Sequence, residues 1–452
     1  MTWTSLGPRL VVAGTHSGVG KTTVATGLLA ALRMTGQSPA GAKIGPDFID
    51  PGYHSIASGR PPRNLDAWMC GPEAIAPLAA RAAAGCGILI IEGVMGLFDG
   101  AGDGTASSTA DVAGMLHAPV VLVVDASAMS NSVAAVVHGY ATWRSDVALA
   151  GVVLNRVGSE GHEILLREAL EPVGIPVLGS LPRDDALQWR DRHLGLVPVA
   201  EQPDLVAASL DRLADVIRAR IDLEAVAAVA RSAPPGRAGP VPLPPPGPAV
   251  RVGVAAGRAF TFTYQDTLEA LTAGGAEVVP FDPLVDDGLP GGIDGLIIGG
   301  GFPEVHAREL SANGSFLSAL STAAGRGLPI WAECGGLLLL CRSIDGERMA
   351  GVIPAAATMT GRLTLGYRDA LTNVASAVGP AGLGMRGHEF HYSEVDRSGE
   401  ALSLSSRWGR RAEGWATPSL LATYLHHHPG GDVRAVAGFL RTCTLRRTLR
   451  VP

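Results

Sequence analysis

The chain has 452 residues, of which 47% are hydrophobic and 17% are charged. This length predicts two or three domains with large buried cores. The net charge of −6 excludes the strong basic excess of most nucleic-acid-binding proteins, so we expect no nucleic-acid partner. The five cysteines are scattered without a CxxC pair, which argues against a disulfide framework or a zinc site.

The N-terminal stretch MTWTSLGPRLVVAG lacks the charged and then apolar segments of a signal peptide. The chain also contains no apolar run that approaches the roughly 20 residues needed to cross a bilayer. We therefore expect a cytoplasmic protein that does not associate with a membrane.

Short β-branched runs alternate with Ala- and Leu-rich stretches of helical length through the first half of the chain. Alternation of this kind predicts an α/β unit. The strand-like runs are continuously apolar, which suits strands buried on both faces of a parallel sheet. We expect strands at residues 9–14, 87–93, 118–126 and 149–156, and helices at residues 22–36 and 130–143.

The first expected strand leads into GTHSGVGKTT, residues 14–23, and then into a helix. Glycines in such a loop let successive amides point at phosphate oxygens, and the helix N-terminus adds a positive end. Lys21 can reach the β- and γ-phosphates, and Thr22 can ligate Mg²⁺. The loop departs from the pattern GxxxxGKS/T, because Thr15 stands where Gly is expected. We still expect ATP to be bound by Gly14, Thr15, Gly18, Gly20, Lys21, Thr22 and Thr23.

Two further stretches place charged residues where strands end. AKIGPDFIDPGYH contains Lys43, Asp47 and Asp50, and LIIEGVMGLFDG contains Glu92 and Asp99. Mg²⁺ prefers hard oxygen ligands, and doubly wound sheets bind ligands at the carboxyl ends of their strands. We expect these carboxylates near the phosphates of ATP, although a turn or helix-cap role stays open and their separate roles are not resolved.

The stretch LNR, residues 154–156, follows another expected strand. Asn155 could hydrogen-bond a purine base, so we include it among the expected ATP-binding residues. An ordinary strand-end asparagine is an equal alternative.

Residues 232–249, SAPPGRAGPVPLPPPGPA, consist mostly of Pro, Gly and Ala. This composition predicts an extended linker that neither pairs in a sheet nor forms a helix. We expect it to join a domain of residues 1–231 to a second domain of residues 250–452.

The second half repeats the alternation of strand-like and helical segments, which predicts a second α/β unit. The two halves share this layout without an obvious internal repeat. We expect strands at residues 250–256, 276–282, 294–300 and 328–334, and helices at residues 265–275 and 315–327.

Three features of the second half are suited to thioester chemistry. Cys334 stands in AECGG, between a strand and a helix, where the helix N-terminus and a nearby imidazole would lower the pKa of the thiol. GGGFPE, residues 299–304, could present backbone N–H groups as an oxyanion hole, and YLHHHPG, residues 424–430, offers a histidine. A core role for the cysteine, and a metal or solvated role for the three histidines, stay open, although alternation along a strand favours one catalytic histidine.

Several long stretches together resemble the cobyrinate and hydrogenobyrinate a,c-diamide synthases, which are glutamine-dependent amidotransferases of corrin synthesis. The N-terminal half is similar to dethiobiotin synthetase and MinD among P-loop ATPases, and the C-terminal half resembles class I glutamine amidotransferase domains. The resemblance therefore implies an α/β protein with two doubly wound domains. It is carried by KIGPDFIDPGYH, RNLDAWM, EGVMGLFDG, RHLGLVP, FTFTYQDTLEAL, GGGFPE, AECGG, GHEFHYS and YLHHH.

The resemblance implies that glutamine is attacked by Cys334, with His426 as the base that takes the thiol proton. It also implies that backbone amides near Gly300, Gly301 and Gly335 hold the carbonyl oxygen. Hydrolysis of the thioester then releases glutamate, and the ammonia serves a second site.

At that second site the family passes the γ-phosphoryl group of ATP to a carboxylate, and ammonia then displaces phosphate. The resemblance implies Thr22, Asp47 and Glu92 as ligands of Mg²⁺. It places Lys43, Asp47, Asp50 and Asp99 near the phosphate or the substrate carboxylate. Done twice, the reaction amidates the a and c acetate side chains of hydrogenobyrinate or cobyrinate in cobalamin synthesis.

One position departs from many class I glutaminase domains, which carry a Glu two residues after the catalytic histidine. His428 stands there, so we expect a Cys–His dyad, and what orients His426 is open. Glu389 in GHEFHYS is a possible helper, with a structural role as an equal alternative.

Two other functions stay open on the sequence alone. The first is amidation of another tetrapyrrole, as in nickel-sirohydrochlorin a,c-diamide synthase or cobyric acid synthase. The second is a non-catalytic, partition-type ATPase switch, which would leave Cys334 and the second domain without a use. A homodimer is the expected assembly by similarity to dethiobiotin synthetase, and neither the presence of cobalt in the ring nor the order of amidation is decided.

Overall fold

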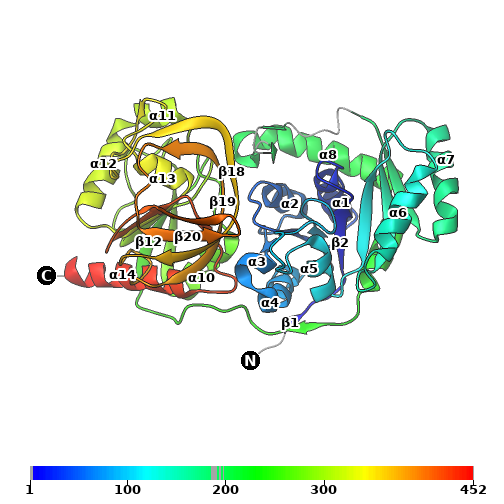
Figure 1. The fold of residues 1–452 in the computed structure, drawn as a ribbon, viewed down its shortest axis with the longest axis horizontal. Helices are drawn as coiled ribbons and strands as arrows, with labels where there is room; N and C mark the ends of the chain where they lie inside the picture. The colour runs from blue at the N-terminus through cyan, green and yellow to red at the C-terminus, as the bar shows by residue number, and fades with distance from the viewer. Residues whose placement is uncertain (1–3, 185–190, 193–194, 197, 451–452) are drawn as a thin grey trace. The chain divides into compact units, whose positions relative to one another are not determined.

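The computed structural model describes residues 4–184, 191–192, 195–196 and 198–450. Its backbone contacts divide the chain into two compact units, Met1–Val241 and Pro242–Pro452 (Figure 1). The division between Val241 and Pro242 falls inside the Pro-rich segment 232–249. Residues 193, 194 and 197 of the RHLGLVP stretch lie outside the described residues.

The N-terminal unit is built on a sheet of seven parallel strands in its described part. The strands are apolar along most of their length and almost completely buried, as expected for a sheet covered on both faces. Their spatial order is β4 (Asn64–Leu65), β3 (Pro39–Ile44), β5 (Ile88–Glu92), β2 (Arg9–Gly14), β6 (Val120–Asp125), β7 (Leu149–Val157) and β8 (Val177–Pro182).

Helices follow these strands along the chain, which is the alternation that the sequence predicts. Helix α1 (Lys21–Met34) has one side packed on the sheet and another on α8 (Pro203–Arg220). The polar residues discussed below stand at the carboxyl ends of β2, β3, β5 and β7, which lie at one edge of a parallel sheet. The other helices of this unit are α2 (Asp50–Ser58), α3 (Ala67–Cys70), α4 (Pro72–Ala83), α5 (Thr109–Met115), α6 (Ser132–Thr142), α7 (Glu160–Leu170) and α9 (Leu223–Arg231).

The prediction that the Pro-rich segment pairs with no strand is wrong at one point. Strand β11 (Arg237–Ala238) pairs antiparallel with β1 (Thr4–Ser5). These two residues keep the backbone N–H groups that the flanking prolines lack, so they can join a ladder. The buried Arg9 guanidinium also donates to the carbonyl of Pro234 at 2.9 Å, which ties the start of the segment to the N-terminal unit.

The C-terminal unit contains a central sheet in which five neighbouring strands are parallel and β22 (Trp415–Thr417) pairs antiparallel at one edge. The parallel strands are β13 (Ala276–Phe281), β12 (Val250–Ala255), β14 (Gly295–Ile298), β15 (Ile330–Glu333) and β23 (Leu420–Thr423). Helices α10 (Gln265–Ala273), α11 (Ala307–Ala312), α12 (Gly314–Gly325), α13 (Gly335–Leu340) and α14 (Arg434–Arg450) belong to this unit. Its core is divided between two buried apolar clusters that include strands of this sheet.

A second, largely antiparallel sheet in the same unit was not predicted. Its long strands β18 (Ala357–Thr372) and β19 (Gly384–Val395) carry many partly exposed polar residues, which hide the apolar alternation of a half-buried sheet. The remaining strands are β16 (Ser343–Ile344), β17 (Glu347–Arg348), β20 (Leu402–Ser406), β21 (Gly409–Glu413) and β24 (His426–His427). Strand β24 pairs with β19, so the histidine stretch lies at the meeting point of the two sheets.

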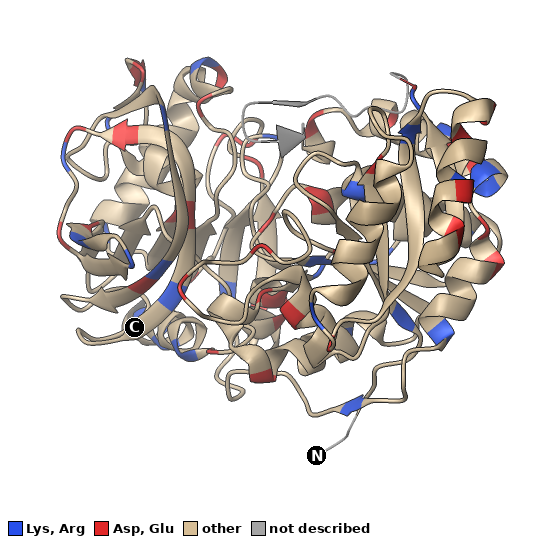
Figure 2. Ribbon diagram, turned by 45° about the vertical axis from the view of Figure 1, so that its right-hand side comes forward, with Lys and Arg blue, Asp and Glu red and all other residues tan. Residues whose placement is uncertain are grey.

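Charged residues of both signs are interspersed along the helices and loops of each unit (Figure 2). This distribution agrees with the small net charge of −6. Across the part of the chain that the structure describes, no helix is both long enough and apolar enough to span a membrane.

Candidate active sites

The phosphate loop runs from the end of β2 to the start of α1. Gly18 and Gly20 adopt φ angles of 80° and 100°, which other residues rarely adopt. A Cβ at Gly14 would stand 2.5 Å from Val19 Cγ2, so the tight turn needs glycine there. The loop therefore has the compact backbone that phosphate binding requires.

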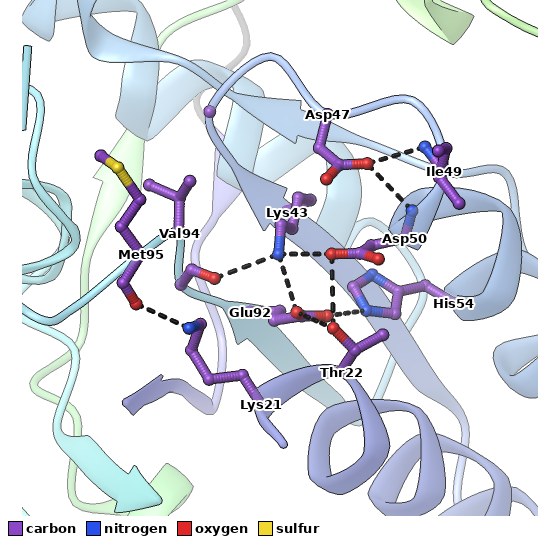
Figure 3. Close-up of polar contacts among 12 residues, drawn as sticks. Lys21, Thr22, Lys43, Asp47, Ile49, Asp50, His54, Glu92, Val94 and Met95 are labelled. Atoms are coloured by element: carbon purple, nitrogen blue, oxygen red, sulfur yellow. Dashed lines mark hydrogen bonds and ion pairs between the residues drawn. The ribbon is translucent and has the colours of Figure 1, made fainter. Parts of the chain in front are cut away.

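Lys21 begins α1 and folds back over the loop. Its Nζ donates to the carbonyl of Met95 at 2.6 Å (Figure 3). It also donates to the carbonyl of His16 at 3.2 Å. Burial, together with the nearby Lys43 ammonium, lowers the pKa of Lys21 to about 8. Neutral carbonyls hold the ammonium, so phosphate oxygens can replace them and gain a charge-assisted interaction.

Glu92, at the end of β5, is the centre of a buried polar network. Its Oε1 accepts from the Thr22 hydroxyl and from the Lys43 ammonium, each at 2.7 Å (Figure 3). Its Oε2 lies 2.7 Å from His54 Nε2. Burial opposes the charge of Glu92, but the Lys43 ammonium and His54 outweigh it and hold the pKa of Glu92 below its ordinary value. The network therefore keeps a carboxylate charged beside the phosphate loop.

Asp50 begins α2 and completes this network. Its Oδ2 lies 2.6 Å from Lys43 Nζ and 3.4 Å from Thr22 Oγ1. Burial and the neighbouring Asp47 raise the pKa of Asp50. Burial would lower the pKa of Lys43, but the carboxylates of Asp50 and Glu92 raise it above its ordinary value.

Asp47 has a different position from the other predicted acidic residues. Its Oδ1 accepts from the backbone N–H groups of Ile49 at 2.7 Å and Asp50 at 3.0 Å (Figure 3). It therefore holds the turn that leads into α2. The structure brings Thr22, Lys43, Asp50 and Glu92 into contact, and Asp47 supports the residue that makes these contacts.

Asp99 and Asn155 each make a hydrogen bond to the backbone of a loop at this site. Asp99 Oδ2 accepts from Gly96 N at 2.8 Å, and a Cβ at Gly96 would meet the Thr15 carbonyl at 2.9 Å. Asn155 Nδ2 donates to the Val19 carbonyl at 2.8 Å, inside the phosphate loop. This contact supports the phosphate loop, and contact of Asn155 with a base stays a prediction.

Cys334 occupies the sharp turn between β15 and α13. Its φ and ψ angles are 48° and −101°, and such a conformation costs a non-glycine residue on the order of 1–3 kcal/mol. Its backbone N–H donates to the Thr423 carbonyl at 2.7 Å, and its Sγ lies 4.0 Å from the Phe390 carbonyl. The strained turn therefore fixes the thiol between the two sheets.

His426 and the glycine loop stand beside this turn. A Cβ at Gly335 would lie 3.0 Å from Gly301 N and 3.3 Å from the Gly300 carbonyl carbon. A Cβ at Gly300 would in turn lie 2.4 Å from His426 Cε1 and 3.2 Å from His426 Nε2. The structure thus gathers the glycine loop, the residue that follows Cys334 and the imidazole edge of His426 in one place.

Burial governs the protonation of both groups. The prediction that the surroundings lower the pKa of the Cys334 thiol is wrong for this structure: burial raises it well above its ordinary value, and the carboxylate of Glu304 acts in the same direction. Burial also lowers the pKa of His426 to about 3, with a further contribution from His388. Burial therefore favours the neutral form of both groups.

Glu389 acts on His426 through its charge, which opposes the lowering of the pKa of His426 by burial. It is fully buried, with Arg368 Nε 2.6 Å from its Oε2, and Arg411 contacts its Oε1. Burial opposes its charge, but His391 and Arg411 hold the pKa of Glu389 at about 2. This ion-pair cluster gives Glu389 a place within the second sheet.

His428 is buried and contacts other residues of the C-terminal unit. Its Nδ1 accepts from Gly430 N at 3.0 Å, and its Nε2 lies 3.7 Å from Asp266 Oδ2. Its ring also lies against Tyr264, with 4.4 Å between the ring centroids.

Two residues in these networks were missed from the sequence. His54 stands four residues after Asp50, a spacing that puts both on one face of α2 and that could have identified it. Glu333 directly precedes Cys334, and its Oε2 lies 3.8 Å from His426 Nδ1. No sequence pattern places this side chain beside the imidazole, because the contact joins β15 to the segment after β23.

Comparisons with known proteins identify both halves. Residues 10–197 match the CobQ/CobB/MinD/ParA nucleotide binding domain, and residues 251–432 match the CobB/CobQ-like glutamine amidotransferase domain. The N-terminal unit is therefore a nucleotide-binding P-loop domain that uses ATP, and the C-terminal unit is a glutamine amidotransferase domain. The predicted α/β class with these two domain types is confirmed.

Curated relatives match the chain from end to end. The hydrogenobyrinate a,c-diamide synthase of Streptomyces coelicolor is 49% identical over 96% of this chain and 97% of its own length. That of Thermobifida fusca is 45% identical over 97% and 98%, and the cobyrinate a,c-diamide synthase of Syntrophotalea carbinolica is 43% identical over 96% and 98%. The chain belongs to the family of glutamine-dependent hydrogenobyrinate and cobyrinate a,c-diamide synthases.

Proposed function

We propose that the protein uses ATP and glutamine to amidate the a and c acetate carboxylates of hydrogenobyrinate or cobyrinate, a step of cobalamin (vitamin B12) synthesis. The observation that carries the proposal is the presence in one chain of a phosphate-loop network around Glu92 and a thiol–imidazole site around Cys334. Relatives named for this reaction match the chain over nearly its whole length.

The first half-reaction moves the γ-phosphoryl group of ATP to a ring carboxylate and gives an acyl phosphate and ADP. Lys21 exchanges its contacts with the Met95 and His16 carbonyls for phosphate oxygens and stabilises the transferring charge. Lys43 lies between Asp50 and Glu92 and keeps both carboxylates in place beside Thr22.

Mg²⁺, when bound, neutralises the charge of the transferring phosphoryl group. Its expected ligands Thr22 and Glu92 are in contact, and Asp50 adds a third oxygen donor, which fits the preference of Mg²⁺ for oxygen. Among the described side chains, no three His, Cys, Asp or Glu residues form a metal cluster. The site therefore suits an ion that is held mainly by phosphate and water. Asp47 acts indirectly, because its carboxylate accepts a hydrogen bond from the backbone N–H of Asp50 and so holds Asp50 in place.

The second half-reaction releases ammonia from glutamine. His426 takes the thiol proton of Cys334, and the sulfur attacks the side-chain carbonyl carbon of glutamine. Backbone amides of Gly301 and Gly335 hold the carbonyl oxygen, whereas the Gly300 N–H, which was also expected there, donates to the Phe262 carbonyl at 3.1 Å. The imidazolium returns its proton to the leaving ammonia. Water then hydrolyses the thioester to glutamate and restores the thiol.

Ammonia completes the reaction at the acyl phosphate. It attacks the acyl carbon, phosphate leaves, and the carboxylate becomes an amide. Two such cycles on one ring give the a,c-diamide and consume two molecules each of ATP and glutamine.

We place this chemistry in the cytoplasm. No disulfide joins the five cysteines, all of which lie in the described residues, and this fits a reducing compartment. The homodimer that similarity to dethiobiotin synthetase implies stays a prediction.

Mass spectrometry of hydrogenobyrinate and cobyrinate, each incubated with ATP, Mg²⁺ and glutamine, tests the proposal. We expect two amide groups on at least one ring, and none when ATP or Mg²⁺ is left out. The ring that reacts settles whether cobalt is present at this step. A product with more than two amides, or no amidation of either ring, would contradict the assignment.

A further inference from the structure

We infer that Glu333 is the positioning residue of the glutaminase site: its carboxylate takes the Nδ1 proton of His426 in a hydrogen bond and so directs Nε2 at the thiol. This inference rests on the proposed function and concerns only its glutamine-hydrolysing half. Glu333 would extend the Cys–His dyad to a triad. It directly precedes the cysteine, whereas the glutamate of many class I glutaminase domains stands two residues after the histidine.

The two nitrogens of the His426 ring face different surroundings. The Nε2 and Cε1 edge lies over Gly300, whose Cβ would stand 3.2 Å from Nε2. Gly300 in turn adjoins Gly335, the residue that follows the nucleophile. The opposite edge presents Nδ1 to Glu333 Oε2 at 3.8 Å. A proton held at Nδ1 leaves a lone pair on Nε2, which is the form that accepts the proton of Cys334.

Backbone contacts hold Glu333 in this position. It is the last residue of β15, and its Oε1 accepts from the backbone N–H of His427 at 3.2 Å. Strand β15 pairs in parallel with β23, with Glu333 opposite Thr423. One carboxylate therefore contacts two consecutive residues, His426 through Oε2 and His427 through Oε1.

The chain places the base and its positioning group on one structural unit with the nucleophile. Glu333 and Cys334 are adjacent, so movement of the strained turn moves both together. The separation of 3.8 Å is longer than a hydrogen bond. Such contacts often shorten when substrate binds. Burial raises the pKa of Glu333 to about 8, and the positive charge that His426 gains after proton transfer favours the carboxylate form.

Glu413 offers a matched control. It is a second buried carboxylate near the same chain segment, where it accepts from the Thr423 hydroxyl and, at 3.3 Å, from the Tyr424 N–H. The described contacts connect it to the strand that precedes His426 without an ion pair to the imidazole. The effect of Glu413→Gln on glutamine hydrolysis therefore shows how much a buried carboxylate contributes when its role is to support the structure.

The experiment measures glutamine hydrolysis and ammonia-driven amidation by the full-length protein, Glu333→Gln, Glu333→Asp and Glu413→Gln. We expect Glu333→Gln to lower kcat for glutamine hydrolysis by about 100-fold, with KM changed less than about threefold. Glu333→Asp should recover part of kcat, because it restores a carboxylate. Glu413→Gln should keep kcat within about threefold of the original, and all variants should amidate the ring normally with ammonia.

The inference is overturned if Glu333→Gln keeps kcat within about threefold of the original, or if KM rises by as much as kcat falls. It is also overturned if Glu333→Asp recovers nothing, or if Glu413→Gln loses as much kcat as Glu333→Gln. Absence of glutamine hydrolysis by the unmodified protein is a separate result, which contradicts the proposed function itself.

Discussion

Lys43 shows at the residue scale how the ATP site is held together. It is 3% exposed, and its ammonium lies within 2.7 Å of both Asp50 and Glu92. Without this cation, the two buried carboxylates would repel each other. No opposite charge would then offset the free energy that burying them costs. We therefore expect the lysine to stabilise the N-terminal unit.

Lys43→Met should lower the free energy of unfolding of the N-terminal unit by about 3–5 kcal/mol. The reason is that it leaves Asp50 and Glu92 buried beside each other without their shared cation. Denaturant titration of the full-length protein measures this change as a lower midpoint of the N-terminal transition. ATP-dependent amidation should be lost at the same time.

Arg167→Met is the control for this prediction, because Arg167 makes an ion pair with Glu163 at 2.7 Å on the exposed surface of α7. Exposed ion pairs contribute only about 0–1 kcal/mol, so the midpoint should barely move. Equal midpoints for the two variants would show that the Lys43 network adds no stability.

The polar residues of the ATP site could be predicted from the sequence more fully than their contacts. Lys43, Asp50 and Glu92 were expected near the phosphates because they follow strands, and the structure joins them in one network. The resemblance grouped Asp47 with Thr22 and Glu92. The structure instead brings Asp50 to Thr22 and uses Asp47 in the turn before α2. That difference depends on where α2 begins. His54 was missed because its contact with Glu92 spans two elements that lie far apart in the chain.

At the element scale, the short helix α13 fixes the position of Cys334 in the proposed glutaminase site. It begins directly after Cys334 and packs against β14 and β15. A Cβ at Gly336 would stand 2.1 Å from the Ile298 carbonyl oxygen, so the helix rests directly on the backbone of β14. This close approach fixes the height of the thiol above the sheet.

Gly336→Ala should push α13 away from β14, because the new methyl group has no free space. We expect glutamine hydrolysis to fall at least about 100-fold, since a displacement of about 1 Å at a reacting group costs that much. Steady-state rates with glutamine and with ammonia measure the effect, and the ammonia-driven rate should stay unchanged.

Gly325→Ala is the matched glycine variant, because a Cβ at this end of α12 would meet no atom within 4 Å. It should leave both rates unchanged. Normal glutamine hydrolysis in Gly336→Ala would mean that the contact between α13 and β14 does not position Cys334.

The elements of the central sheets could be predicted because their strands are continuous apolar runs. All the strands expected in the first half and in the second half are present. The second sheet of the C-terminal unit was missed because β18 and β19 are rich in polar residues and alternate irregularly in burial. The pairing of β24 with β19 could not be predicted from the sequence either, because a two-residue strand is too short to show an alternation of apolar and polar residues.

The whole molecule joins two chemical units, each with its own core and its own buried polar network. The phosphate-loop network lies within Met1–Val241, and the thiol–imidazole site lies within Pro242–Pro452. The composition of residues 232–249 predicted this division, and the resemblance implied the two domain types, which the matches at residues 10–197 and 251–432 also identify. In the proposed reaction, the C-terminal unit releases ammonia and the N-terminal unit activates the acid that accepts it.

Ring amidation and glutamine hydrolysis by Cys334→Ala and Lys21→Ala, measured with glutamine and then with ammonia, test this claim most directly. Cys334→Ala should lose amidation with glutamine and keep it with ammonia, because the thiol serves only the release of nitrogen. Lys21→Ala should lose amidation with both nitrogen sources and still hydrolyse glutamine. Loss of ammonia-driven amidation in Cys334→Ala, or its survival in Lys21→Ala, would contradict the account.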